Sequence, residues 1–217
     1  MKFKNATRDL RLKINERLYL KSKSPFAPKF YKDFSPKGFK IFTFHSGFKK
    51  SDEDLLIIVF EKNINVICKY SLTTTPSAPI IWDKKNNKGQ CRALVVNSGN
   101  ANAHTGAQGI KNINKYTKQL AKYLSCSINE ILVSSTGVIG EQFDPNLICN
   151  KIKLLPNSKE KKLIDAARSI WTTDTFVKTS VHDITIGNQT IKCYGFAKGS
   201  GMINPNMGTM LAYIFID

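Results

Sequence analysis

The chain has 217 residues, of which 41% are hydrophobic, and a formal net charge of +17 at pH 7. This length fits one large domain or two small ones, and the hydrophobic content excludes a chain that is disordered by composition. The charge raises the question of nucleic-acid binding, but no block of Lys and Arg is interleaved with aromatic residues. We therefore expect no nucleic-acid surface, and a positive field that favours small anionic substrates.

The cysteines, histidines and N-terminal residues limit the compartment and the cofactors. Five cysteines form no Cys-x-x-Cys pair, and three histidines have no metal-ligand spacing. We expect reduced thiols that pack as small apolar groups, no metal site and no membrane span. Residues 1–32 form a basic extension, but Asp9 and Glu16 make it unlike a transit peptide. A cytoplasmic location is therefore favoured, with the mitochondrial matrix as the alternative.

Short apolar runs between polar turns predict four strands in the first half of the chain. The run at 55–60 is apolar throughout, as is typical of a strand that is buried on both faces. A hairpin at 63–65 is expected to return the chain as another strand. The four predicted strands are 39–44, 55–60, 66–70 and 91–96.

The second half of the chain alternates helices and strands. Apolar residues at i, i+3 and i+4 spacing predict an amphipathic helix over 110–124, and Ser127 and Glu130 have the spacing of a capping box. This alternation predicts one layered α/β domain. The further predicted elements are a strand at 131–133, helices at 145–153 and 157–171, and strands near 184, at 191–197 and at 211–216.

Four polar segments rich in Gly, Asn or Thr follow the ends of predicted elements, where functional loops are usually built. Thr136 and Gly137 offer a hydroxyl and an unencumbered backbone N–H, which suit an oxyanion hole, although a strand-ending turn explains them equally. Lys198 beside two glycines either holds a carboxylate or is a solvated charge. The four segments are 97–106, 134–140, 172–175 and 198–209.

The Gly208–Thr209 bond is a candidate for self-cleavage. The hydroxyl of Thr209 can attack the carbonyl of Gly208 through a five-membered ring, and hydrolysis of the resulting ester would cut the chain. Thr209 would then carry a free α-amine with a pKa of about 7.7–8.0, which can deprotonate its own hydroxyl. The simpler interpretation is a turn that enters a strand and exposes a threonine.

In this order, the segments NSGNANAHTG, SSTGVIG, WTTDT and AKGSGMINPNMGTMLAYI resemble the bifunctional ornithine acetyltransferase (glutamate N-acetyltransferase) family of arginine biosynthesis, the ArgJ family. PKGF, GFKK..EDL and TTTPSAP resemble its N-terminal landmarks, so the resemblance covers residues 36–217. It implies stacked α/β layers with a self-cleaving threonine nucleophile. It also implies an α-chain domain at 33–208 and the start of a β chain at 209–217.

The resemblance also implies a role for each matching residue. Thr209 is the expected nucleophile, and Gly208–Thr209 is the expected cleavage site. Thr136 and Gly137 match the oxyanion-hole pair. Thr172, Lys198 and Thr209 match substrate-binding positions.

The implied reaction moves an acetyl group from N-acetylornithine to glutamate through an acetyl-threonine intermediate. It needs no cofactor, although some members of the family also use acetyl-CoA as a donor. The implied assembly is an (αβ)₂ heterotetramer with the β chain of the same precursor, without nucleic-acid or membrane partners. The alternatives are a threonine amidase or aminopeptidase of the same superfold, an inactive fragment, and a non-enzymatic basic binding protein.

The chain departs from the family pattern in two places. Gly208 stands where the family usually has Ala, and glycine is more costly to hold in a strained conformation. The sequence ends at Asp217, eight residues after Thr209, whereas the family's second chain is comparable in size to the first. We therefore expect an enzyme that is incomplete as this chain alone.

Overall fold

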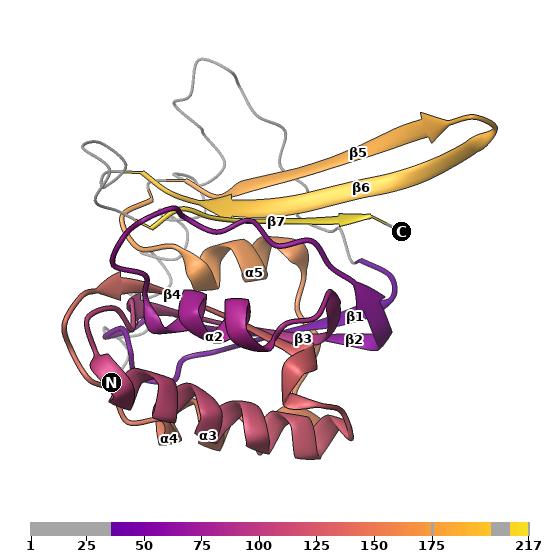
Figure 1. The fold of residues 1–217 in the computed structure, drawn as a ribbon. Coiled ribbons are helices and arrows are strands. Elements are labelled where there is room, and N and C mark those ends of the chain that lie inside the picture. The colour runs from indigo at the N-terminus through magenta and orange to yellow at the C-terminus, as the bar shows by residue number, and fades with distance from the viewer. Residues whose placement is uncertain (1–35, 175, 201–208, 217) are drawn as a thin grey trace, which may run out of the picture.

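The computed structural model describes residues 36–174, 176–200 and 209–216. Two β-sheets lie one above the other with helix α5 (Leu163–Ile170) between them (Figure 1). The remaining helices cover the other face of the larger sheet. The predicted layered α/β fold is therefore confirmed. The predicted extension at 1–32 lies outside the described residues.

The larger sheet has the order β1-β2-β3-β4. β1 pairs with β2, and β2 with β3, in antiparallel fashion, whereas β3 and β4 are parallel and are joined through α3. Both faces of the sheet are covered by helices, which explains why its strands are apolar runs rather than alternating ones. The strands are β1 Phe39–Phe44, β2 Leu55–Asn65, β3 Gln90–Asn100 and β4 Ile131–Val138.

The predicted hairpin at 63–65 and the return strand at 66–70 are wrong. β2 continues to Asn65, because a register shift after Val59 keeps Ile64 paired with Cys91 of β3. Residues 66–70 form no strand, and the Val66 amide donates to the carbonyl of Gly89.

The helices differ from the sequence prediction in two ways: one observed helix was not predicted, and another is shorter than predicted. α2 was not predicted from the sequence, in which this helix directly follows a segment rich in Thr and Pro. The segment 158–162, which precedes α5, is extended chain whose Lys161 amide donates to Ile41 of β1. The observed helix α5 is therefore shorter than the helix predicted at 157–171. The other helices are α2 Ala78–Asn86, α3 Gly106–Leu124 and α4 Asn146–Ile152.

The smaller sheet has the order β5-β6-β7 and is antiparallel throughout. Its inner face packs against α5 and β1 through an aromatic cluster, in which the rings of Phe39 and Phe215 are 4.7 Å apart. Its outer face exposes Ile214 and Ile216, and the β5–β6 hairpin projects beyond the body of the molecule (Figure 1). The strands are β5 Lys178–Ile186, β6 Gln189–Lys198 and β7 Leu211–Ile216, as the sequence predicted in outline.

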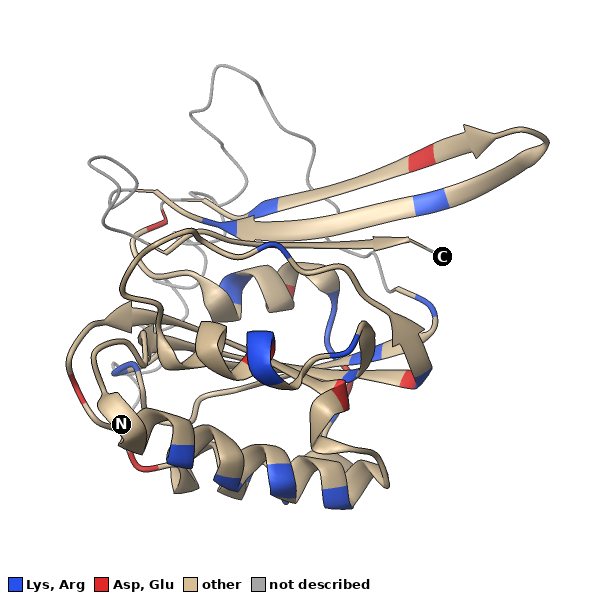
Figure 2. Cartoon of the chain, viewed as in Figure 1, with Lys and Arg blue, Asp and Glu red and all other residues tan. Residues whose placement is uncertain are grey.

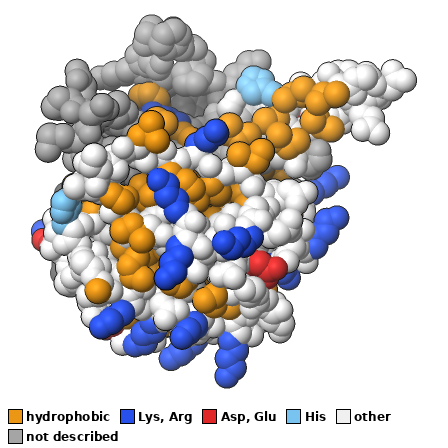
Figure 3. Space-filling model, in the orientation of Figure 1, with side chains coloured by type: hydrophobic (Ala, Val, Ile, Leu, Met, Phe, Trp, Pro, Cys, Tyr) orange, Lys and Arg blue, Asp and Glu red, His pale blue; other side chains and the backbone are white. Residues whose placement is uncertain are grey.

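Among the charged side chains on the face in view, basic ones prevail, and α3 carries several of them without a single acidic residue (Figures 2 and 3). All five cysteines are free thiols, and Cys91 and Cys149 are buried as expected. Among the described residues, no helix is long and apolar enough to span a membrane.

Candidate active site

The ammonium group of Lys198 lies at the end of β6, where only 2% of the residue is exposed. It donates three hydrogen bonds to threonine oxygens. The Nζ–O distances are 3.0 Å to Oγ1 of Thr136, 2.8 Å to Oγ1 of Thr172 and 3.2 Å to the carbonyl oxygen of Thr209. The three bonds use every proton of the ammonium group.

These residues come from distant parts of the chain. Thr136 belongs to β4 of the larger sheet, Thr172 follows α5, and Thr209 lies two residues before β7. The ends of β4 and β6 and the start of β7 lie on the same side of the molecule (Figure 1). The structure therefore joins four of the residues that the sequence singled out, at the junction of the two sheets. Gly208 lies outside the described residues.

Burial lowers the pKa of Lys198 below its usual value, because removing water disfavours the charged form. The negative charge of Asp174 opposes this shift, and the positive charge of Lys178 adds to it. The threonine oxygens that accept from Lys198 are all neutral. Within the described residues, no carboxylate contacts this cation directly, so a substrate carboxylate that replaces one of the three neutral acceptors would find an unpaired positive charge.

Gly137 occupies a position that only glycine fits. Its φ angle is +135°, and a Cβ atom there would lie 2.2 Å from the carbonyl carbon of Gly99. The two glycines face each other because β4 runs parallel to β3 up to Val138. The predicted strand at 131–133 is therefore too short, and Thr136 and Gly137 belong to a strand end rather than a loop. Thr136 itself is fully buried.

A chain of polar side chains supports this strand end. The Ser135 hydroxyl donates to Oδ1 of Asn97 at 2.6 Å, and the Asn97 amide donates to the carbonyl of Asn100 at 2.8 Å. The Asn100 amide in turn donates to the carbonyl of Glu141 at 2.9 Å. Residues 97–100 thus support this strand end through hydrogen bonds, and they extend β3 instead of forming the expected loop.

Asp54 is a further buried residue near the site, and no sequence motif assigned it a role of its own. Its carboxylate accepts hydrogen bonds from the amides of Ser46 at 2.7 Å, Gly47 at 3.0 Å and Lys49 at 2.9 Å. These bonds hold the β1–β2 loop against Gly99, where a Cβ atom would lie 2.6 Å from the carbonyl oxygen of Phe48. The signal in the sequence was an acidic residue directly before the wholly apolar run at 55–60.

Lys49 is a second lysine with an altered pKa. Its Nζ atom donates to the carbonyls of Glu53 at 3.3 Å and Ser169 at 3.4 Å. Burial lowers its pKa to about 8, and the charge of Lys198 contributes in the same direction, whereas nearby carboxylates oppose the shift. The sequence contained this lysine in the GFKK landmark but gave it no role.

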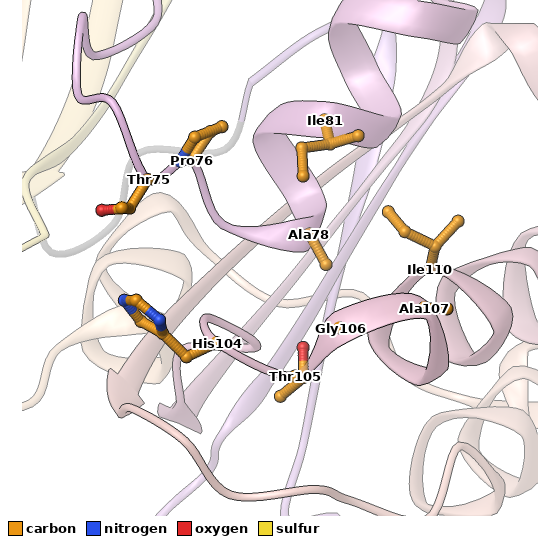
Figure 4. A pocket seen from close by; sticks show the side chains of 9 residues that line it. All are labelled: Thr75, Pro76, Ala78, Ile81, His104, Thr105, Gly106, Ala107 and Ile110. Carbon is orange, nitrogen blue, oxygen red and sulfur yellow. The ribbon is translucent and has the colours of Figure 1, made fainter.

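Lys198 and the threonines that accept its hydrogen bonds line neither of two hollows found among the described residues. A pocket of about 370 Å³ opens where α2 and α3 begin, and His104 and Thr105 lie on one side of it with Pro76 and Ile81 on the other (Figure 4). A second hollow, of about 440 Å³, lies on the β5–β7 sheet. Within the described residues, no group of three His, Cys, Asp or Glu side chains is placed to hold a metal ion.

Sequence comparison finds one family. The model of the ArgJ family matches residues 40–217. The arginine biosynthesis bifunctional protein ArgJ of Caldanaerobacter subterraneus subsp. tengcongensis is 39% identical over 184 residues, which are 84% of this chain and 46% of that protein. ArgJ of Bradyrhizobium diazoefficiens is 40% identical over 200 residues, which are 90% of this chain and 48% of that protein. The chain thus spans about half the length of the curated relatives it matches.

Structural comparison finds the same family. The crystal structure of the bifunctional protein ArgJ from Bacillus halodurans matches with a TM-score of 0.71 and 31% identity, over 81% of this chain and 92% of that chain. Ornithine acetyltransferase of Mycobacterium tuberculosis, in complex with ornithine, matches with a TM-score of 0.65 over 82% of this chain and 94% of that chain. At 23% identity, the second match is evidence of the fold alone.

Proposed function

This chain belongs to the ArgJ family, and on that premise we propose that it carries the nucleophile and oxyanion hole of a glutamate N-acetyltransferase. The enzyme moves an acetyl group from N-acetylornithine to glutamate in arginine biosynthesis. The observation that carries the proposal is the contact of Lys198 with Thr136, Thr172 and Thr209. It gathers the expected nucleophile, oxyanion-hole and substrate-binding positions around one buried cation.

The proposed chemistry is a double displacement. The Thr209 hydroxyl loses its proton to a base and attacks the acetyl carbonyl of N-acetylornithine, and the C–N bond breaks as the departing ornithine amine takes up a proton. The amine of glutamate then attacks the acetyl ester, and the Thr209 oxygen leaves and is protonated again. Each step passes through a tetrahedral oxyanion, which Thr136 and Gly137 stabilise. The loss of one such donor typically costs about 2.7–4 kcal/mol.

Thr209 becomes the nucleophile when the Gly208–Thr209 bond is cut. The proposed boundary then separates an α-chain domain at 33–208 from a β chain that begins at Thr209. β7 is hydrogen-bonded along β6, from the Lys198–Leu211 pair to the Cys193–Ile216 pair, so the two parts would stay together after cleavage. The β chain of the same precursor completes the site in an (αβ)₂ heterotetramer.

The substrates and the location follow from the same premise. Both N-acetylornithine and glutamate carry an α-carboxylate, and Lys198 with Thr172 offers a cation and a hydroxyl to bind it. The relative from Mycobacterium tuberculosis is described in complex with ornithine. Acetyl-CoA is a further candidate donor. We place the enzyme in the cytoplasm, because five free thiols fit a reducing compartment.

The test is acetyl exchange in the assembled enzyme. The chain is co-expressed with the C-terminal part of a curated relative, and transfer of labelled acetyl from N-acetylornithine to glutamate is measured together with the intact mass. Thr209→Ala should abolish both cleavage and transfer. Thr190→Ala, an exposed threonine of β6, is the matched control and should leave both intact. Normal transfer in Thr209→Ala would refute the assignment of the nucleophile.

A further inference from the structure

The carboxylate of Asp174 lies next to the two residues in contact, Lys198 and Thr172, and only 1% of its side chain is exposed. Its Oδ1 atom accepts hydrogen bonds from the Gly199 amide at 2.9 Å and from Nζ of Lys178 at 2.5 Å. Its Oδ2 atom accepts a longer bond, of 3.5 Å, from the amide of Thr172. One buried carboxylate therefore joins three segments of the chain.

Two of these segments carry the candidate site. Thr172 is itself an acceptor of Lys198, and Gly199 directly follows Lys198 in the chain. We propose that Asp174 is a positioning residue, which holds the backbones beside Lys198 and Thr172 so that the ammonium group meets the hydroxyl. The proposal rests on the proposed function, because it concerns the same site.

A local ion pair with Lys178 would be the simpler explanation, since the two residues are four apart. Such a pair gains little at a surface and gives no reason to bury the carboxylate. Here burial raises the pKa of Asp174, but bonds from Lys178, Gly199 and Thr172 outweigh it and the net pKa is lowered. The carboxylate is thus kept charged, as its bond to the Gly199 amide favours.

The charge of Asp174 also acts on Lys198. Burial lowers the pKa of Lys198, and Asp174 is the group that opposes this loss of proton affinity. Lys178 acts in the other direction, and Lys49 is a further cation that interacts with Lys198. Removal of either partner of the Asp174–Lys178 pair should therefore move the titration of Lys198, in opposite directions.

The experiment is an NMR titration of the 217-residue chain with ¹³C-labelled lysine. Lys198→Arg removes one signal and so assigns it. Asp174→Asn keeps an oxygen for the Gly199 amide but removes the charge, and the titration midpoint of Lys198 should fall. Asp183→Asn is the matched control, since Asp183 pairs with the exposed Lys192 in the hairpin, and it should leave the midpoint where it is.

Lys178→Met tests the direction of the electrostatic effect on Lys198. It removes a nearby positive charge and should therefore raise the titration midpoint of Lys198. Hydrogen exchange at the Gly199 amide tests the contact: exchange should be slow in the unaltered chain and in Asp174→Asn, and faster in Asp174→Ala. An unchanged Lys198 midpoint in a folded Asp174→Asn variant, or shifts of the same sign in both charge variants, would overturn the proposal. These readouts need no acetyl transfer, so failure of the proposed function would be seen separately.

Discussion

Gly99 and Gly137 face each other across the parallel β3–β4 pair so closely that a Cβ atom on Gly137 would lie 2.2 Å from the carbonyl carbon of Gly99. The approach is possible because Gly137 has no side chain, whereas a Cβ atom on Gly99 would instead meet the carbonyl group of Phe48. The approach brings the two strand ends together directly beside Thr136. The hydroxyl of Thr136 accepts a hydrogen bond from the ammonium group of Lys198. The backbone of this strand end is therefore fixed by packing.

Gly137→Ala should destabilise the fold by about 2–4 kcal/mol, because the new methyl group meets backbone atoms and the φ angle is positive. Gly140→Ala is the matched control. Gly140 also has a positive φ angle, but nothing lies within 4 Å of its Cβ position, so only about 1–2 kcal/mol should be lost. Urea unfolding measures both values. Equal losses would contradict the packing argument.

Asp54→Ala should cost about 2–5 kcal/mol of stability, because it leaves the buried amide of Ser46 and the partly buried amides of Gly47 and Lys49 without this acceptor. Asp52→Ala removes an exposed carboxylate from the same loop and should change stability by no more than about 0.5 kcal/mol. The measurement is again the free energy of unfolding in urea. A small effect of Asp54→Ala would mean that water can replace the carboxylate.

The elements that the sequence predicted correctly are those with a strong local pattern. The runs at 39–44 and 211–216 coincide with β1 and β7, and the predicted helix at 110–124 lies within α3. α2 has no comparable apolar periodicity, and its burial against α3 and β4 decides its conformation. The return strand at 66–70 was predicted wrongly because β2 pairs with β3, which lies further along the chain, and a local turn signal does not reveal such a distant partner.

The site was predictable in part for the same reason. Motif order identified Thr136, Thr172, Lys198 and Thr209, but no local pattern states that the Lys198 ammonium reaches across 62 residues to Thr136. Buried hydrogen bonds between distant segments also define the role of Asp54. Such contacts depend on how the two sheets stack, which residue spacing does not encode.

Thr136→Ala should lower kcat of the assembled enzyme by about 100- to 1000-fold while KM changes little, because the lost interaction belongs to the oxyanion of the transition state. Thr136→Ser keeps the hydroxyl that accepts from Lys198 and should restore most of the activity. Steady-state kinetics with N-acetylornithine separates the two constants. An effect confined to KM would place Thr136 in substrate binding instead.

Asp83 should make the stability of the chain depend on pH. The residue is on α2, is 6% exposed, and has a pKa that burial raises from 3.8 to about 8, against a hydrogen bond from the Val133 amide. Between these two values the folded state holds a proton that the unfolded chain has released. The free energy of unfolding should therefore fall as pH rises through this window, by up to about 1.4 kcal/mol per pH unit.

Asp83→Asn isolates this effect, because the amide stays neutral in both states and its oxygen can still accept from the Val133 amide. The stability of the variant relative to the unaltered chain should increase steadily from pH 4 to pH 8, as followed by urea unfolding at several pH values. Asp183→Asn changes an exposed carboxylate, and the pH dependence of its free energy of unfolding should be nearly parallel to that of the unaltered chain. Parallel curves for Asp83→Asn as well would mean that the Asp83 carboxyl is ionised within the fold, and that α2 holds a buried charge against β4.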